Sequence, residues 1–137
     1  VLPTGYNIYE RDSYEGDLSD LAIDEGLGVI TYYSLASGFL TGKYRSTHDL
    51  QKSARGGGVK SYLNERGLKI LAALDKVAAN HAAAPAEVAL AWLMAREGVT
   101  APIASATSLD QLDSLIRSTQ LLLSDEDMAC LNQSSAM

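Results

Sequence analysis

The residues best suited to chemistry in this sequence follow a short apolar run. Residues 31–45 read TYYSLASGFLTGKYR, which passes from aromatic residues into small residues, glycines and cations. Small residues let backbone N–H groups approach a phosphate, and basic side chains add positive charge. The residues of these two kinds are Ala36, Ser37, Gly38, Lys43, and either Arg45 or Arg55. The stretch predicts an anion-binding loop, although a tight turn beside a solvated lysine accounts for the same residues.

A second candidate loop reads SATSLDQ, at residues 105–111. A predicted strand leads here directly into a helix, so free N–H groups and the positive end of the helix dipole would face a bound anion. Ser105, Thr107 and Ser108 add hydroxyl groups. Ser108 and Gln111 also form the S-x-x-Q pattern of a helix capping box, which is a purely structural explanation. Both loops follow predicted parallel strands, at the edge where α/β folds bind ligands.

Short apolar runs predict the strands that carry these loops. Residues 27–33 (LGVITYY) and 99–106 (VTAPIASA) show no polar alternation, which is typical of parallel strands buried on both faces. The sequence also opens on part of a strand. Apolar residues at helical spacing predict helices at residues 17–26, 62–81, 85–97, 108–119 and 123–133. This alternation indicates an α/β architecture with right-handed crossovers.

The helical patterns also predict which faces are buried. The inward face of the helix at 62–81 comprises Ile70, Leu71, Leu74, Val77 and Ala78. The inward face of the helix at 108–119 comprises Leu109, Leu112, Leu115 and Ile116. The helix at 85–97 begins with Pro85 and is apolar around most of its circumference, so it should be covered on most sides.

A few further side chains invite a functional reading beside a structural one. Strand alternation should send one of Tyr32 and Tyr33 inward and the other outward, for core packing or for stacking on a flat ring. Trp92 is expected in the core. His81 is expected near the last carbonyls of its helix, and Cys130 as a small buried apolar residue.

Composition limits the class of protein. The chain of 137 residues is 47% hydrophobic, which suits one domain spanning residues 1–137. Its net charge of −6 argues against non-specific nucleic-acid binding. The single cysteine forms no internal disulfide, and with two distant histidines it predicts no metal site. Without a membrane-length apolar run or a signal-peptide pattern, a soluble cytoplasmic protein is expected.

Four segments resemble a known family in their order and spacing. They are YNIYERDSYEGDL, GLGVITYYSLASGFLTGKYR, SARGGGVKSYLNERG and PIASATSLDQL. Together they resemble the second half of the aldo/keto reductase superfamily, in particular bacterial members near the voltage-gated potassium channel β-subunit branch. The resemblance covers the whole chain. It implies the second half of a (β/α)8 TIM barrel, NADP(H) binding, and an oxidoreductase that transfers hydride between nicotinamide and an aldehyde or ketone.

The resemblance also implies a set of cofactor-binding residues, which joins the two loops into one dinucleotide site. The resemblance assigns Tyr32 to the nicotinamide. The residues that it assigns to the pyrophosphate are Leu35, Ala36, Ser37, Lys43 and Arg55, and those for the adenosine end are Ser105, Thr107 and Gln111.

Three positions depart from the family pattern. Many relatives carry a lysine or arginine where Ser108 stands, and its absence leaves NAD open as an alternative to NADP. An asparagine often found near the adenine corresponds to Leu115. A glutamine that contacts the carboxamide should fall near Pro3 and is not found there.

The family's catalytic residues have no matching positions in this sequence. A barrel of this kind needs roughly 250 residues, and the family's catalytic Asp, Tyr, Lys and His come from its first half. The isolated chain is therefore expected to lack efficient carbonyl reductase activity, because the proton donor is absent.

An open half-barrel would expose strand edges and an apolar interior, so something should cover it. The first hypothesis is a C-terminal fragment of a complete reductase that needs its missing N-terminal half. The sequence lacks an initial methionine and opens mid-strand, which favours this hypothesis. The alternative is a non-catalytic nucleotide-binding module stabilised by self-association or by a partner.

Overall fold

The computed structural model describes residues 2–42, 60–106 and 108–136. Its centre is a sheet of three parallel strands, ordered β1 (Leu2–Gly5), β2 (Val29–Tyr32) and β3 (Val99–Pro102). The pairing of β2 with β3 contains an irregularity between Val29 and Ile30. These parallel strands confirm the predicted α/β architecture.

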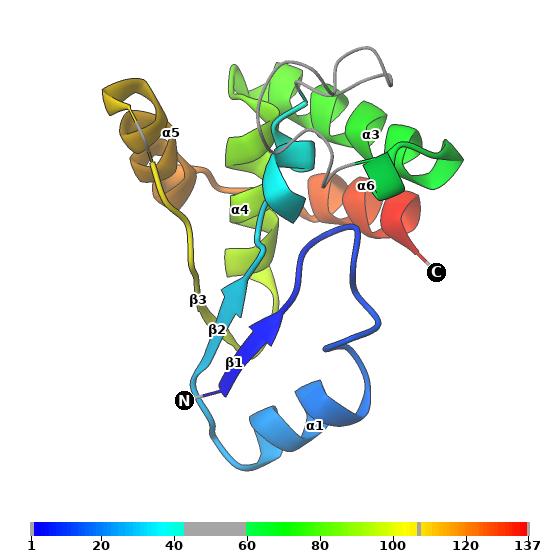
Figure 1. The fold of residues 1–137 in the computed structure, drawn as a ribbon, viewed down its shortest axis with the longest axis vertical. Helices are drawn as coiled ribbons and strands as arrows, with labels where there is room; N and C mark the ends of the chain where they lie inside the picture. The colour runs from blue at the N-terminus through cyan, green and yellow to red at the C-terminus, as the bar shows by residue number, and fades with distance from the viewer. Residues whose placement is uncertain (1, 43–59, 107, 137) are drawn as a thin grey trace.

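Helices connect and follow the strands in the expected alternation. They are α1 (Asp17–Asp24) between β1 and β2; η1 (Ala36–Thr41), η3 (Lys60–Tyr62), α3 (Glu65–His81) and α4 (Pro85–Ala95) between β2 and β3; and α5 (Leu109–Gln120) and α6 (Asp125–Ser135) after β3. In Figure 1, α1 lies at one end of the molecule, while α3 and α6 pack together at the other.

Local sequence signals account for several helix ends. The Asn64 side chain caps α3 by accepting a 2.8 Å hydrogen bond from the Gly67 N–H group. Ser124 and Asp127 form a reciprocal capping box at the start of α6. Pro85 occupies the first turn of α4 as expected, and Gly26 follows α1 in the left-handed region, at φ 64°.

The core lies where α3 and α4 pack together. All five residues predicted on the inner face of α3 are buried. Seven consecutive residues of α4, from Glu87 to Leu93, are also buried, which confirms that this helix is covered on most sides. Trp92 is fully buried, and its Nε1–H donates to Asn132 Oδ1 of α6 at 2.9 Å.

The predicted burial of β3 and α5 is wrong. Thr100, Ala101 and Ile103 are exposed, because their side chains are not covered by the described residues. On α5, Leu109 is 79% exposed, and Leu112 and Ile116 are also exposed. This helix packs on α4 but leaves most of its apolar face uncovered by the described residues.

The β2 strand is also less buried than its composition predicts. Val29 and Thr31 are buried, but Ile30 is half-buried and Tyr32 is exposed. The run therefore has one covered face and one face that is partly open. None of the helices in the described ranges is both long and apolar enough to cross a membrane.

A hydrogen bond joins α3 to α6 at a residue that the sequence placed only at a helix end. His81 ends α3 as expected, and its Nε2 lies 2.6 Å from Asp127 Oδ2. Burial of Asp127 opposes its ionisation, but hydrogen bonds from His81 and Ser124 outweigh burial and hold the pKa of Asp127 below its usual value. Cys130, on the same helix, is half-buried rather than buried.

The depressed pKa of Asp127 predicts a pH-dependent contribution to stability. The ionised carboxylate stabilises the fold fully above the ordinary Asp pKa of about 3.9, and this contribution is lost as the pH falls through the lower folded-state pKa. Asp127→Asn should therefore lower the free energy of unfolding at neutral pH, and the deficit should shrink in acid. Urea unfolding across pH measures it, with Asp125→Asn as the control. A deficit independent of pH would contradict this assignment.

Candidate functional site

The carboxyl ends of the three strands meet at one edge of the sheet. Gly5 pairs with Tyr32, and Thr31 pairs with Pro102. Backbone hydrogen bonds continue one residue further, because the Tyr6 N–H group donates to the Tyr32 carbonyl at 3.3 Å and the Ile103 N–H group donates to the Thr31 carbonyl at 2.7 Å. The loops after β2 and β3 therefore begin side by side, as the sequence predicts for parallel strands.

The Asn7 side chain connects the loop after β1 to the loop after β2. Asn7 is 1% exposed, and its Nδ2 donates to the Tyr33 carbonyl at 2.9 Å. Its Oδ1 accepts hydrogen bonds from the N–H groups of Tyr9 and Glu10, both at 2.8 Å. One buried amide thus fixes the backbone of both loops.

The two tyrosines at the end of β2 do not alternate inward and outward as predicted. Tyr32 is 45% exposed and Tyr33 is 67% exposed. Tyr33 adopts a left-handed backbone conformation, with φ 53°, which ends the regular alternation of the strand. Its ring meets the Tyr32 ring edge-on, with centroids 5.4 Å apart. Both rings are therefore accessible at the carboxyl edge.

The turn after β2 uses its small residues mainly for internal contacts. The Ala36 N–H group donates to the Tyr33 carbonyl at 2.9 Å, and the Gly38 N–H group donates to the Leu35 carbonyl at 3.0 Å. Ala36 is fully buried. Two of the N–H groups that the sequence assigns to a phosphate are therefore already bonded within the turn.

The described candidate residues lie in different environments. Tyr32 is exposed, and Leu35 packs half-buried against the core. Ser105 and Gln111 are exposed, and the Gln111 N–H group donates to the Ser108 side chain at 3.2 Å, as expected for the cap of α5. The remaining candidates are Ser37, whose backbone lies in η1, and Lys43, Arg55 and Thr107, which lie outside the described residues.

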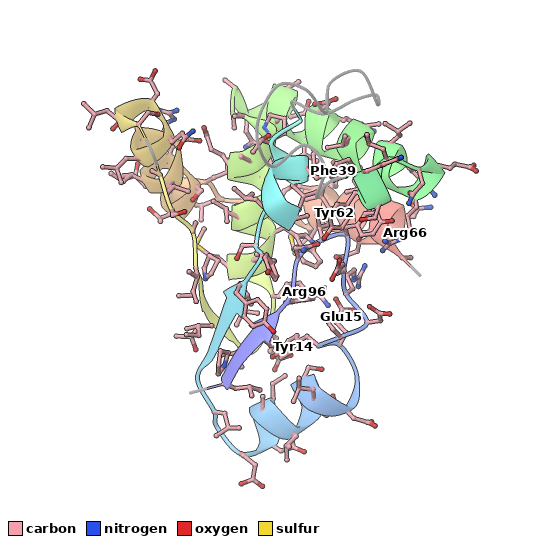
Figure 2. All side chains as sticks on the ribbon, viewed as in Figure 1. Tyr14, Glu15, Phe39, Tyr62, Arg66 and Arg96 are labelled. Atoms are coloured by element: carbon pink, nitrogen blue, oxygen red, sulfur yellow. The ribbon has the colours of Figure 1, made fainter. Side chains whose placement is uncertain are left out.

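A polar network behind this edge was not predicted from the sequence. The Glu15 carboxylate accepts hydrogen bonds from the Tyr6 hydroxyl at 2.6 Å and from Arg11 Nε and Nη2 at 2.7 and 2.8 Å. Arg96, from the end of α4, lies 3.4 Å from Glu15 and donates to the Tyr6 hydroxyl at 3.1 Å. Figure 2 shows Glu15 in the segment that follows β1, with Arg96 beside that segment. Only the Arg11–Glu15 spacing carried a local signal.

The electrostatics of this network favour a supporting role. Burial, and then the hydrogen bond to Glu15, raise the pKa of Tyr6 above its ordinary value. Burial alone would raise the pKa of Glu15, but hydrogen bonds from Arg11 and Tyr6 leave it below the ordinary range. Tyr6 therefore stays protonated and Glu15 stays ionised near neutral pH. The network braces the segment preceding α1 against α4.

A hollow of about 320 Å³ lies on the helix side of this network. Its lining includes Tyr14, Ser19 and Ile23 from the α1 side and Arg96 from the end of α4. It lies between α1 and α4, away from the loops that follow β2 and β3. The hollow therefore does not coincide with the candidate cofactor residues.

An aromatic cluster holds η1 beside η3. The Phe39 and Tyr62 rings stack with centroids 5.4 Å apart, and Tyr9 meets Tyr62 edge-on at 4.8 Å. The Tyr62 hydroxyl donates to Glu10 Oε1 at 2.9 Å, and the Arg66 guanidinium lies over the Tyr9 ring. Figure 2 labels Phe39, Tyr62 and Arg66 in this cluster. The sequence contained these aromatics but no spacing that paired them.

The aldo/keto reductase family model matches residues 2–136. This chain therefore belongs to the aldo/keto reductase family.

Individual relatives share about a third of its residues. L-glyceraldehyde 3-phosphate reductase of Escherichia coli O157:H7 is 30% identical over 135 residues, covering 93% of this chain and 39% of that protein. An uncharacterised oxidoreductase of Mycobacterium bovis is 34% identical over 137 residues, covering 95% of this chain and 40% of that protein. The chain thus spans about two fifths of the length of these relatives.

A solved structure shows the same fold. A thermostable aldo-keto reductase, crystallised with the inhibitor epalrestat, superposes with a TM-score of 0.69. The match covers 96% of this chain and 38% of that one, at 24% identity. The three strands and their helices therefore match part of an aldo-keto reductase barrel.

The buried Asn7 amide yields a stability prediction. Asn7→Ala removes the buried partner of the Tyr33 carbonyl and of the Tyr9 and Glu10 N–H groups, and should lower the free energy of unfolding by about 3 kcal/mol. Asn64→Ala, which truncates an exposed amide at a helix cap, should cost about 1 kcal/mol. Chemical denaturation compares the two variants. An Asn7→Ala cost no larger than that of Asn64→Ala would contradict the role given to Asn7.

Proposed function

We propose that this chain is the cofactor-binding second half of an aldo/keto reductase, with NADP(H) as the preferred dinucleotide and NAD as the alternative. The observation that carries the proposal is the accessible Tyr32 ring at the carboxyl edge, beside the β3 loop that leads to Ser105 and Gln111. Membership of the aldo/keto reductase family is the reason for assigning a nicotinamide dinucleotide to this edge. A flat exposed ring suits stacking on nicotinamide, and polar groups that follow the adjacent strand suit the adenosine end.

The proposed site runs across the ends of β2 and β3. Tyr32 stacks on the nicotinamide, Leu35 and Ser37 line the pyrophosphate, and Ala36, which is fully buried, shapes the turn between them. Because the Ala36 and Gly38 N–H groups are bonded within the turn, positive charge for the pyrophosphate comes from the side chains of the next segment. The proposed residues there are Lys43 and Arg55, and those for the adenosine end are Ser105, Thr107 and Gln111.

The proposed reaction separates cofactor binding from proton transfer. When bound, the nicotinamide supplies hydride to a carbonyl carbon or receives it from an alcohol. The developing alkoxide also requires a positioned acid. Tyr6 does not fit that role, because its proton is directed to Glu15 and burial raises its pKa. We therefore place the catalytic Asp, Tyr, Lys and His in a segment that has no counterpart in this sequence.

A second candidate function is a nucleotide-binding module that works without catalysis. Its support is the exposed apolar face of α5, which either candidate must cover, because Leu109, Leu112 and Ile116 lie uncovered by the described residues. A homo-oligomer or another protein would cover this face, as would the N-terminal half of a reductase. Sedimentation distinguishes the two candidates, because a stable dimer of this chain that binds NADPH supports the module.

Cofactor binding can be tested at the pyrophosphate position. Ser37→Asp places a carboxylate beside the proposed diphosphate, and like charges should weaken NADPH binding by about tenfold or more. Gln133→Glu adds the same charge on an exposed face of α6 and serves as the control. Titration of NADPH fluorescence measures both. Equal affinities for Ser37→Asp and the control would remove this placement.

The separation of binding from catalysis gives a second prediction. The isolated 137-residue chain should show no aldehyde-dependent NADPH oxidation at ordinary enzyme rates, because it lacks the proton donor. Absorbance at the NADPH band measures this, with a complete aldo/keto reductase as the positive control. Turnover of aldehydes at the rates of the complete enzyme would refute the prediction.

A further inference from the structure

Gly5, at the end of β1, lies directly beside the Tyr32 ring. An ideal Cβ built on Gly5 would lie 3.1 Å from Tyr32 Cε2, 3.5 Å from Cζ and 3.7 Å from Cδ2. A side chain at position 5 would therefore project directly against the Tyr32 ring. Because Gly5 and Tyr32 are register partners on adjacent parallel strands, this contact follows from the sheet itself.

The backbone of Gly5 gives no other reason for glycine. It lies in a strand and is absent from the glycines with positive φ, which include Gly16, Gly26 and Gly98. Gly28, immediately before β2, differs because its ideal Cβ meets nothing closer than Thr100 Oγ1 at 3.6 Å. The constraint at position 5 is therefore the neighbouring ring and not the conformation of the chain.

Other contacts fix both sides of this arrangement. The Ser13 hydroxyl donates to the Gly5 carbonyl at 2.7 Å, which holds the end of β1. The Tyr33 ring lies edge-on to Tyr32, and Asn7 holds the Tyr33 carbonyl at 2.9 Å. The Tyr32 ring is therefore bounded by Gly5 and Tyr33, yet it remains 45% exposed.

We propose that Gly5 is a positioning residue for Tyr32: its missing side chain seats the ring so that the exposed part is presented to the nicotinamide. The cofactor part of this inference rests on the function proposed above. Binding geometries of this kind are sensitive to displacements of about 0.5 Å. A methyl group at 3.1 Å from the ring would push it by a few tenths of an ångström, and a β-branched side chain would push it further.

The contact between Gly5 and the Tyr32 ring can be tested without any cofactor. In the full 137-residue chain, nuclear Overhauser contacts between the Gly5 α-protons and the Tyr32 ring are expected. Tyr32 ring resonances should shift in Gly5→Ala and shift more in Gly5→Val, but remain unchanged in the control Gly28→Ala. Gly5→Ala is the milder change and keeps the test usable if Gly5→Val does not fold. Unchanged Tyr32 resonances in Gly5→Ala would overturn the proposal.

The link to the cofactor is tested by a double-mutant cycle. Gly5→Val should weaken NADPH binding by about tenfold, and the same change in a Tyr32→Ala background should have no further effect. An equal loss in both backgrounds would overturn the positioning role. If the unsubstituted chain binds no NADPH, the proposed function fails, while the resonance shifts still decide whether Gly5 seats the Tyr32 ring.

Discussion

The buried amide of Asn7 is the interaction on which the carboxyl edge depends. It makes hydrogen bonds to Tyr33, Tyr9 and Glu10, and so joins the segments that leave β1 and β2. A left-handed residue such as Tyr33 costs about 1–2 kcal/mol of conformational strain, which neighbouring contacts must offset. Asn7 and the Ala36 N–H group supply those contacts at the Tyr33 carbonyl. The orientation of the exposed tyrosines is thus set from inside the fold.

Two groups of side chains support this edge from distant parts of the chain. The Glu15 network ties the segment after β1 to Arg96 at the end of α4, and Arg11 extends it to the Asn132 carbonyl of α6. The aromatic cluster around Tyr62 joins the same segment to η1 and η3. Neither group needs to touch a ligand to matter, because each restricts where the loops can begin. Rigid support of this kind is what a binding edge built from loops requires.

The sequence predicted the positions of the helices better than it predicted which of their side chains are buried. Helical periodicity and caps located α3, α4 and α6, because those signals are local. Periodicity shows which face of α5 is apolar but not whether anything covers that face. The predicted burial of Leu109 is therefore wrong. Alternation failed at Tyr33 because one left-handed residue redirects the side chain. The Tyr6–Arg96 contact joins residues far apart in sequence, and no spacing predicts it. Of the candidate site, Tyr32 ends β2 at the expected edge and Ser105 follows β3, whereas Gln111 lies in the first turn of α5; their roles stay predictions.

The segments that connect the strands differ in length, so the entropic cost of closing them differs between the two strand pairs. β1 reaches β2 through one short helix, but β2 reaches β3 only after η1, η3, α3 and α4. Each doubling of the length of a closed segment adds only about 0.6 kcal/mol to the entropic cost of closing it. This added cost opposes the pairing of β3 with β2. β3 also lies at the edge of the sheet, with a bonding partner on one side among the described strands. The two ends of the proposed dinucleotide site therefore rest on strands held with unequal strength, and the end on β3 is the weaker.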